Sequence, residues 1–393
     1  MIRIILNTVL FIWIISLPFK NAIFQLSSFL ILLLALVSMV KEHHMDILQS
    51  IITRYKDILL LFILIVITMY ISNFLGTNSM KGYRISTEFL FRYGVMFIAL
   101  LYFYKIKYIN KKNLLYFILI SLILQAILGF YQQFTGIDLL TNKVVAYGYR
   151  IYGGMFNPNP FGLVMAIGAI IITNLLMRDT QMINQKTSLL SLNILLLVFL
   201  FAMLYSGSRS SWLMYGVFVL FQFLFIQTKN KTKIFYISVG IFLVLLLFII
   251  NSSDLSFRFH QLMVGYSSSR VDMWSDIIHV FIKNPILGYG PDAFKTVIHS
   301  SVNSTHNSFL EILLFTGIIG LVFFTFLIIK VYLEAKKNNN SIYISLFFAL
   351  LFVSQFDHSV FTSKIFLTIL VLYSFYIFSP RLDVNDEREY SND

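Results

Sequence analysis

The sequence predicts an all-α integral membrane protein with about twelve transmembrane helices, and three observations carry this prediction. Of the 393 residues, 58% are hydrophobic and 12% are charged, whereas soluble domains average about 45–50% and about 25%. Apolar runs recur evenly along the chain, and basic residues gather in alternate connections between these runs. We expect a single polytopic membrane domain over residues 1–379 and a polar cytoplasmic tail over residues 380–393.

Twelve apolar runs are suited to cross roughly 30 Å of hydrocarbon as helices. They lie near residues 4–19, 22–40, 57–75, 88–104, 114–133, 159–177, 189–205, 211–227, 234–250, 308–330, 341–354 and 362–378. The first run resembles a signal peptide, but no small-residue cleavage site follows it before the second run begins. We therefore expect it to remain as the first helix.

The orientation follows from the basic residues, which concentrate in the cytoplasmic connections of membrane proteins. Every second connection is basic here, so these short connections and both termini are predicted to be cytoplasmic. Their basic residues are Lys41, Arg54, Lys56, Lys105, Lys107, Lys111, Lys112, Arg178, Lys186, Lys229, Lys231, Lys233, Lys330, Lys336 and Lys337. The two long connections, near 135–158 and 251–307, are then extracytoplasmic, and long connections are where function tends to lie.

Several classes of chemistry find no support in the composition. The net charge of +12 does not indicate nucleic-acid binding, because the basic residues lie between apolar runs rather than on one basic face. The chain has no cysteine, which excludes disulfides, thiolate catalysis and Cys-ligated metal. It also has no HExxH motif, P-loop, dinucleotide fingerprint or GxSxG elbow. We expect neither a metal site nor a cofactor.

The large outer loop, residues 251–307, contains a predicted amphipathic helix. Apolar residues recur at helical spacing, with charged residues between them: Val271, Trp274, Ile277, Ile278 and Phe281, with Asp272, Asp276 and Lys283. Asn284-Pro285 would end this helix, and Gly288-Tyr289-Gly290-Pro291 is a turn cluster. The pattern fits a helix on the outer membrane interface and, equally, an ordinary surface helix packed on the bundle.

Four arginines on the predicted outer face are candidates for binding phosphate groups, which guanidinium groups bind bidentately. They are Arg150, Arg209, Arg258 and Arg270. Around Arg209, the small polar residues Ser208 and Ser210 leave room for a bulky anion. Arg150 and Asn157 lie in a stretch rich in Gly and Pro that leads into a helix. The alternative for each arginine is a snorkelling or solvated charge.

His306 is the candidate general base. It lies where the large outer loop enters the next span, followed by Asn307 and, about one turn later, Glu311. An imidazole titrates near neutral pH and accepts a proton from an acceptor hydroxyl. The alternative is a histidine that caps the helix or forms another hydrogen bond at the membrane interface. His358, beside Asp357 in the last outer connection, is a weaker candidate for the same face.

The spacing from His306 onward resembles a known family signature. His306-Asn307, nine residues, Gly317, two residues and Gly320 resemble the signature of the O-antigen ligase and polysaccharide polymerase superfamily. Three further elements agree with this resemblance: Ser208 to Trp212 (SRSSW), Arg270 with Trp274 downstream, and Asn284 to Phe294 (NPILGYGPDAF). The resemblance covers roughly residues 145–330.

The resemblance implies a GT-C-type glycosyltransferase with twelve helices, inverting and metal-independent. Such enzymes move a glycan from undecaprenyl diphosphate to a glycan or lipid acceptor outside the bacterial cytoplasmic membrane. Partners would include membrane lipid and other membrane proteins of polysaccharide assembly. The implied catalytic residues are His306, Arg270 and Arg209, and the substrate-binding residues are Arg258, Arg150, Asn307, Ser208, Ser210, Trp274 and Asn157.

Three functions are compatible with these motifs. The Lys, Ile, Asn and Phe bias resembles that of an AT-rich, Gram-positive genome. Because such an organism has no lipopolysaccharide, this bias favours a capsule or exopolysaccharide polymerase over an O-antigen ligase. The third reading is a transporter or flippase of lipid-linked sugars, which would more often carry charges midway through its spans.

Overall fold

The computed structural model describes residues 2–19, 21–145, 150–177, 186–225, 252–264, 270–298, 305–338, 341–356 and 359–380. These residues are mostly helical, as predicted. A short antiparallel hairpin of β1 (Ile137–Asp138) and β2 (Lys143–Val144) departs from the all-α expectation, and Ile137 pairs with Val144 in it. The chain divides into two compact units: residues 1–117, 268–338 and 358–393 form unit 1, and residues 118–267 and 339–357 form unit 2.

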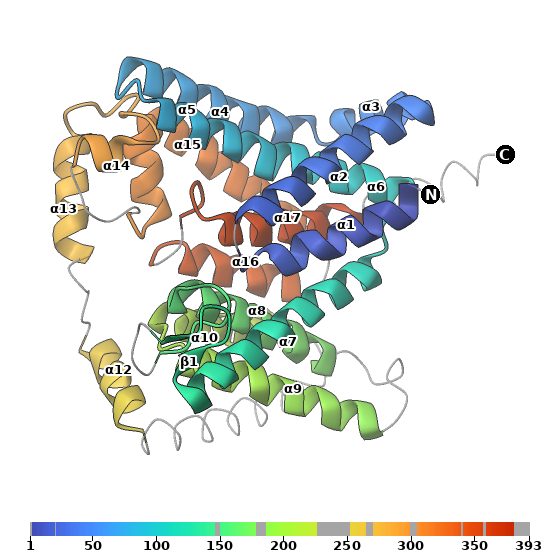
Figure 1. The fold of residues 1–393 in the computed structure, drawn as a ribbon. Coiled ribbons are helices and arrows are strands. Elements are labelled where there is room, and N and C mark those ends of the chain that lie inside the picture. The colour runs from blue at the N-terminus through green and yellow to red at the C-terminus, as the bar shows by residue number, and fades with distance from the viewer. Residues whose placement is uncertain are drawn as a thin grey trace. The chain divides into compact units, whose positions relative to one another are not determined.

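Unit 1 contains most of the first third of the chain together with the candidate histidine (Figure 1). Its elements are α1 (Ile2–Ser16), α2 (Asn21–Lys41), α3 (Met45–Arg54), α4 (Lys56–Leu75), α5 (Met80–Phe89), the π-helix η1 (Leu90–Val95), α6 (Met96–Lys105), α13 (Arg270–Phe281), α14 (Ala293–Thr296), α15 (Ser308–Lys337) and α17 (Lys364–Phe378). Helix α4 packs along α15. Aromatic contacts join α5 and α15, since the ring centroid of Phe361 lies 5.0 Å from that of Phe89 and 5.9 Å from that of Phe315, with the rings tilted.

Unit 2 holds the middle of the chain. Its elements are α8 (Pro158–Met177), α9 (Lys186–Tyr205), α10 (Arg209–Phe225), α12 (Ser253–Met263), α16 (Ser341–Val353) and the β-hairpin, and α7 (Lys111–Thr135) begins in unit 1 and continues into unit 2. Helix α10 packs against α8 and α16. Buried polar side chains connect these helices, because Gln222 bonds to Ser341 and Ser345 on α16 at 2.9 Å each.

Among the described residues, six helices are long and apolar enough to cross a membrane, which makes the chain an integral membrane protein. They are Ala22–Lys41, Lys56–Leu75, Met80–Lys105, Lys111–Thr135, Pro158–Met177 and Ser308–Lys337. Shorter apolar helices cover five more predicted runs: Ile2–Ser16, Leu189–Tyr205, Arg209–Phe225, Ser341–Val353 and Lys364–Phe378. The run at 234–250, the tail after Pro380 and the pair Asp357 and His358 lie outside the described residues. The count of twelve spans stays a prediction.

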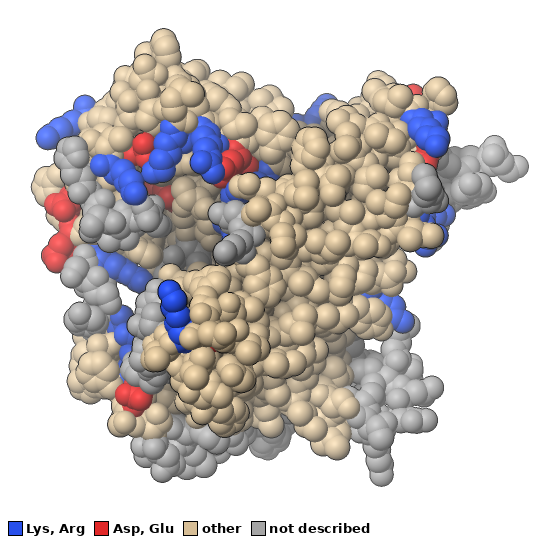
Figure 2. Space-filling model, in the orientation of Figure 1, with Lys and Arg blue, Asp and Glu red and all other residues tan. Residues whose placement is uncertain are grey.

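The surface has the character expected of helices surrounded by lipid. Large apolar side chains such as Phe29, Leu36 and Leu60 are more than half exposed, which water would disfavour but hydrocarbon does not. In Figure 2 the charged side chains lie in a few groups, one of them near α5 and α14, with wide uncharged surface between them.

Candidate active site

His306 lies in the short segment that leads into α15 of unit 1. Its backbone is left-handed, with φ of +53°, a conformation that residues other than Gly, Asn and Asp adopt rarely because Cβ crowds the following carbonyl. Non-glycine residues in such conformations concentrate at active sites, where the surrounding structure holds them in place. The conformation of His306 therefore needs support from its neighbours.

The residue before His306 supplies part of this support. Thr305 is fully buried, and its carbonyl oxygen accepts a hydrogen bond of 2.9 Å from the indole nitrogen of Trp274. The Thr305 hydroxyl donates to the Asn307 carbonyl at 2.8 Å. Trp274 lies on α13, the helix that begins with Arg270. One hydrogen bond thus joins the helix that carries Arg270 to the residue before His306.

Helix α13 confirms the helix predicted in the large outer loop and ends at Phe281, before Asn284-Pro285. It packs against α15, with Ile277 fully buried. Val271 and Ile278 remain 58% and 46% exposed. One apolar side of the helix is therefore packed on unit 1, as expected for a surface helix, while other apolar side chains stay open to the surroundings.

Asn307, rather than His306, is the N-cap of α15. Its side-chain oxygen accepts hydrogen bonds of 3.0 Å from the backbone N–H groups of Phe309 and Leu310. These N–H groups have no partner within the helix, so a capping side chain stabilises the helix terminus. The interpretation of His306 as the helix cap is wrong, because Asn307 supplies the cap.

We expect Asn307→Ala to lower the free energy of unfolding by about 1 kcal/mol, because alanine cannot accept the two cap hydrogen bonds. Asn307→Ser should retain most of the stability, since serine is an equally good cap. Equilibrium unfolding in detergent measures both variants. A loss of donor binding in the serine variant at unchanged stability would instead favour the predicted substrate-binding role of Asn307.

Helix α15 is broken at Gly317, the glycine of the motif that begins with His306. Gly317 has φ of +64° and ψ of −160°, which is not helical. The segment that follows α13 fills the break: the N–H groups of Tyr289 and Gly290 donate to the Leu314 and Phe315 carbonyls at 2.9 Å each. On the other side of the break, the Pro285 carbonyl accepts from Ile318 N–H at 2.9 Å. Backbone groups freed by the break are thus satisfied within the protein, as membrane depth requires.

A buried carboxyl group lies in the first half of this broken helix. Glu311 is 1% exposed, and its Oε2 accepts a hydrogen bond of 2.7 Å from the Ser359 hydroxyl. The Ser359 hydroxyl in turn accepts from the N–H groups of Phe361 and Thr362. An ionisable residue inside a span is costly and usually serves function or placement. Here it ties the half of α15 that follows His306 to the connection before α17.

Three of the four predicted arginines gather in unit 2 around one turn, Ser206–Gly207–Ser208, which we call the arginine turn. Arg150 Nε donates to the Ser206 carbonyl at 2.8 Å. Arg258 donates to the Gly207 carbonyl from Nε at 3.2 Å and from Nη2 at 3.0 Å. Arg209 follows the turn directly and opens α10. Three guanidinium groups around one turn make this place strongly positive.

Local packing explains why the arginine turn can form. Gly207 has φ of +60°, which glycine adopts without strain, and Arg150 Nε would lie 3.0 Å from a Cβ at this position. Helix α12 is held beside the turn because its Leu255 is buried against Leu204, with Trp212 packed alongside. Gln261 of the same helix accepts from Arg209 through its carbonyl at 3.1 Å and from Arg258 through its side chain at 2.8 Å.

The two predicted serines of this turn are buried and bonded to other hydroxyls. Ser208 and Ser210 are 2% and 7% exposed, and the Ser208 hydroxyl lies 3.2 Å from Ser210 Oγ and 2.8 Å from Ser211 Oγ. Gly162 of α8 approaches them closely, since a Cβ there would lie 2.7 Å from Ser208 Cβ. Their observed contacts hold the turn against α8.

The first long connection is anchored by two buried glutamines of α7. Gln132 Oε1 accepts from the N–H groups of Tyr152 and Gly153 at 2.9 Å each, and Gln125 Oε1 accepts from Gly154 N–H at 2.8 Å. This anchoring directs Arg150 to the arginine turn. Asn157 is exposed, and its side-chain oxygen accepts from Asn159 N–H at 2.9 Å.

The structure therefore assembles the predicted residues into two groups, each within its own unit. Unit 1 holds Arg270, Trp274, His306 and Asn307, and unit 2 holds Arg150, Arg209, Arg258, Ser208, Ser210 and Asn157. Sequence reasoning missed Gln125 and Gln132, although two glutamines seven residues apart in an apolar run are a visible signal. Within the described part of the chain, no three His, Asp or Glu side chains gather as metal ligands do.

Comparison with protein families identifies the region that contains most of these residues. Residues 194–325 match the family described as O-antigen ligase, and this stretch includes Arg209, Arg258, Arg270, Trp274 and His306. No curated protein matches the chain. The family match confirms the predicted resemblance: residues 194–325 of this integral membrane protein are similar to the O-antigen ligase family.

Proposed function

We propose that this chain is a membrane glycosyltransferase of polysaccharide assembly that takes its glycan from undecaprenyl diphosphate. The reaction occurs on the extracytoplasmic face and inverts the anomeric centre without a metal. The acceptor is a further glycan unit, so the enzyme is a capsule or exopolysaccharide polymerase. The family match supports glycan transfer, whereas the choice of polymerase over ligase rests on the composition of the sequence.

The arginine turn is the observation that carries this proposal. Guanidinium groups that lie close together repel one another. A doubly charged diphosphate relieves this repulsion and accepts hydrogen bonds from their N–H groups. Arg150 and Arg258 are already fixed by backbone carbonyls of the turn, so their orientation is set before a ligand arrives. Arranged in this way, they favour the charge that grows on the leaving diphosphate as its bond to the sugar breaks.

The proposed chemistry has one proton transfer and one displacement. His306 accepts the proton of the acceptor hydroxyl, and the hydroxyl oxygen attacks the anomeric carbon of the donor sugar. The bond from that carbon to the diphosphate oxygen breaks, and undecaprenyl diphosphate leaves with the bonding electron pair. Arg209 and Arg270 stabilise its negative charge in the transition state.

The test is turnover by the purified protein in lipid, supplied with undecaprenyl-diphosphate oligosaccharide. We expect release of undecaprenyl diphosphate together with a longer glycan. Arg209→Ala and Arg270→Ala should each lower kcat/KM at least about a hundredfold, which corresponds to roughly 2.7 kcal/mol of transition-state stabilisation. Arg54→Ala, which changes an arginine of α3 on the predicted cytoplasmic face, serves as the matched control.

The products and the binding data separate the alternatives. Glycan attached to a lipid or cell-wall acceptor, with no lengthening, would indicate a ligase. Folded protein that binds the lipid donor but transfers its glycan to none of the acceptors offered would favour a transporter of lipid-linked sugars. In that case the arginines would be binding residues only.

A further inference from the structure

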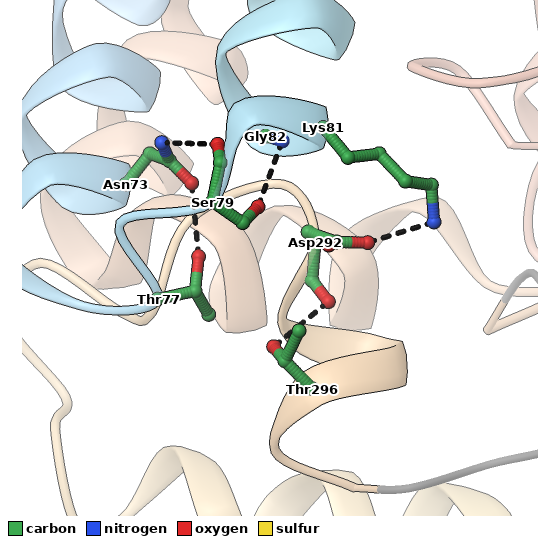
Figure 3. Close-up of polar contacts among 7 residues, drawn as sticks. All are labelled: Asn73, Thr77, Ser79, Lys81, Gly82, Asp292 and Thr296. Atoms are coloured by element: carbon green, nitrogen blue, oxygen red, sulfur yellow. Dashed lines mark hydrogen bonds and ion pairs between the residues drawn. The ribbon is translucent and has the colours of Figure 1, made fainter.

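The turn between α4 and α5 is joined by an ion pair to the segment that fills the break in α15 (Figure 3). Lys81 Nζ lies 2.7 Å from Asp292 Oδ1, and both residues belong to unit 1. The Lys81 side chain is 51% exposed, whereas that of Asp292 is 10% exposed. The Asp292 carboxylate is therefore largely removed from water, and the ammonium group of Lys81 compensates its negative charge.

Hydrogen bonds hold the α4–α5 turn, which precedes Lys81, in one conformation. Asn73 is fully buried; its side chain donates to the Ser79 carbonyl at 3.1 Å and accepts from the Thr77 hydroxyl at 2.9 Å. The Ser79 hydroxyl caps α5 by accepting from Gly82 N–H at 2.9 Å. These bonds, drawn in Figure 3, fix the helix start on which Lys81 lies.

The segment on the other side of the ion pair lies directly against this turn. Thr77 N–H donates to the Tyr289 carbonyl at 3.0 Å. Gly290 has φ of +92°, and a Cβ there would lie 2.9 Å from the backbone nitrogen of Asn73. Only glycine permits this approach at this backbone conformation. Asp292 follows two residues later and secures the segment through Lys81.

The same segment holds the first half of α15. Tyr289 and Gly290 donate to the carbonyls of Leu314 and Phe315, which lie in the last turn before the break at Gly317. His306 precedes this half-helix by two residues. A continuous path of short contacts therefore runs from Lys81 through Asp292 and Gly290 to the half-helix that follows His306.

We propose that Lys81 and Asp292 are positioning residues for glycan transfer, whose ion pair fixes the half of α15 that follows His306 against the α4–α5 turn. The inference rests on the proposed function of His306. In this proposal neither residue contacts the reacting atoms. Both act indirectly, through Gly290 and the half-helix. Misplacement of a reacting group by about 1 Å can lower a rate about a hundredfold, so loosening this anchor should affect turnover strongly.

An exposed ion pair would have no such effect, because surface pairs contribute about 0–1 kcal/mol. The chain offers a matched example on the same helix. Arg84 Nε lies 2.8 Å from Glu88 Oε1, the Arg84 side chain is 71% exposed, and both residues lie within α5. Glu88 keeps a second ion pair, with Arg92 of the adjoining η1 at 3.2 Å, when Arg84 is replaced. Arg84→Met is therefore the control for Lys81→Met.

The experiment compares wild type, Lys81→Met, Asp292→Asn, Lys81→Arg, the exchanged pair Lys81→Asp with Asp292→Lys, and Arg84→Met. Each is assayed for turnover with undecaprenyl-diphosphate oligosaccharide, and each is followed by hydrogen exchange over residues 284–292 and 305–318. We expect Lys81→Met and Asp292→Asn to lower kcat about 10- to 100-fold with the KM for the donor unchanged, and to accelerate exchange in both peptides. Lys81→Arg and the exchanged pair should recover kcat, and Arg84→Met should resemble wild type.

Two results would overturn the proposal. One is unchanged exchange over 305–318 in Lys81→Met, because the ion pair would then not hold the half-helix. The other is faster exchange with wild-type kcat, because the held position would then not matter for transfer. If the wild-type protein transfers no glycan, the proposed function fails and the catalytic role of the pair fails with it, while the exchange data still show whether the anchor exists.

Discussion

Replacing His306 with asparagine should lower the turnover number at least about a hundredfold while the protein stays folded and binds its lipid donor. The proposed role of His306 is to accept the proton of the acceptor hydroxyl, and general bases contribute about 10²- to 10⁴-fold to such reactions. Asparagine cannot accept this proton. It does tolerate a left-handed backbone, which matters because His306 has φ of +53°. His306→Asn therefore removes the imidazole with little change to the backbone.

His306→Ala and His306→Gly complete this comparison. Alanine loses the base and is also strained at positive φ, whereas glycine loses the base and relieves the strain. If catalysis depends on the imidazole, the three variants should be similarly inactive although their stabilities differ. Turnover and thermal unfolding measured on the same preparations check this. An active glycine variant beside an inactive alanine variant would show that only the backbone conformation matters, and His306 would not be the base.

The positions of the helices along the chain were largely predictable from the sequence, because hydropathy is a local property. Each predicted apolar run within the described residues contains a helix, and α13 ends where Asn284-Pro285 predicts. Asn307 as the cap of α15 was also within reach, because Asn directly before an apolar run is a known start signal. Instead, Asn307 was predicted to bind substrate, and His306 was the alternative candidate for the cap.

The contacts that build the candidate site were not predictable, because they join segments far apart in the chain. Arg150 and Arg258 donate to the neighbouring carbonyls of Ser206 and Gly207 from positions more than 50 residues away on either side. Lys81 and Asp292 are separated by 211 positions, and a single sequence carries no signal for such a pair. The break at Gly317 is hidden for a related reason: the run around it is apolar enough on average that its hydropathy predicts one continuous helix.

The largest effect on stability is expected for Gly317→Ala. A Cβ at this position would overlap the Ile286 carbonyl and lie 2.6 Å from Leu287 N. The backbone, with φ of +64° and ψ of −160°, is in a region that is essentially restricted to glycine. Relief of the overlap would push residues 285–290 out of the break and leave the Leu314 and Phe315 carbonyls without their donors, at about 1–3 kcal/mol for each unsatisfied group. We expect the variant to lose several kcal/mol of stability and all measurable transfer.

Gly216→Ala is the matched control for this prediction. Gly216 lies within α10, another apolar helix, and a Cβ there would meet no atom within 4 Å. Alanine should be neutral or slightly stabilising at Gly216, because a helix interior favours alanine over glycine by about 1 kcal/mol. Thermal unfolding in the same detergent compares the two substitutions. If Gly317→Ala unfolds at the wild-type temperature, α15 can close its break and release the 285–290 segment, and the anchoring of the half-helix that follows His306 would need a different explanation.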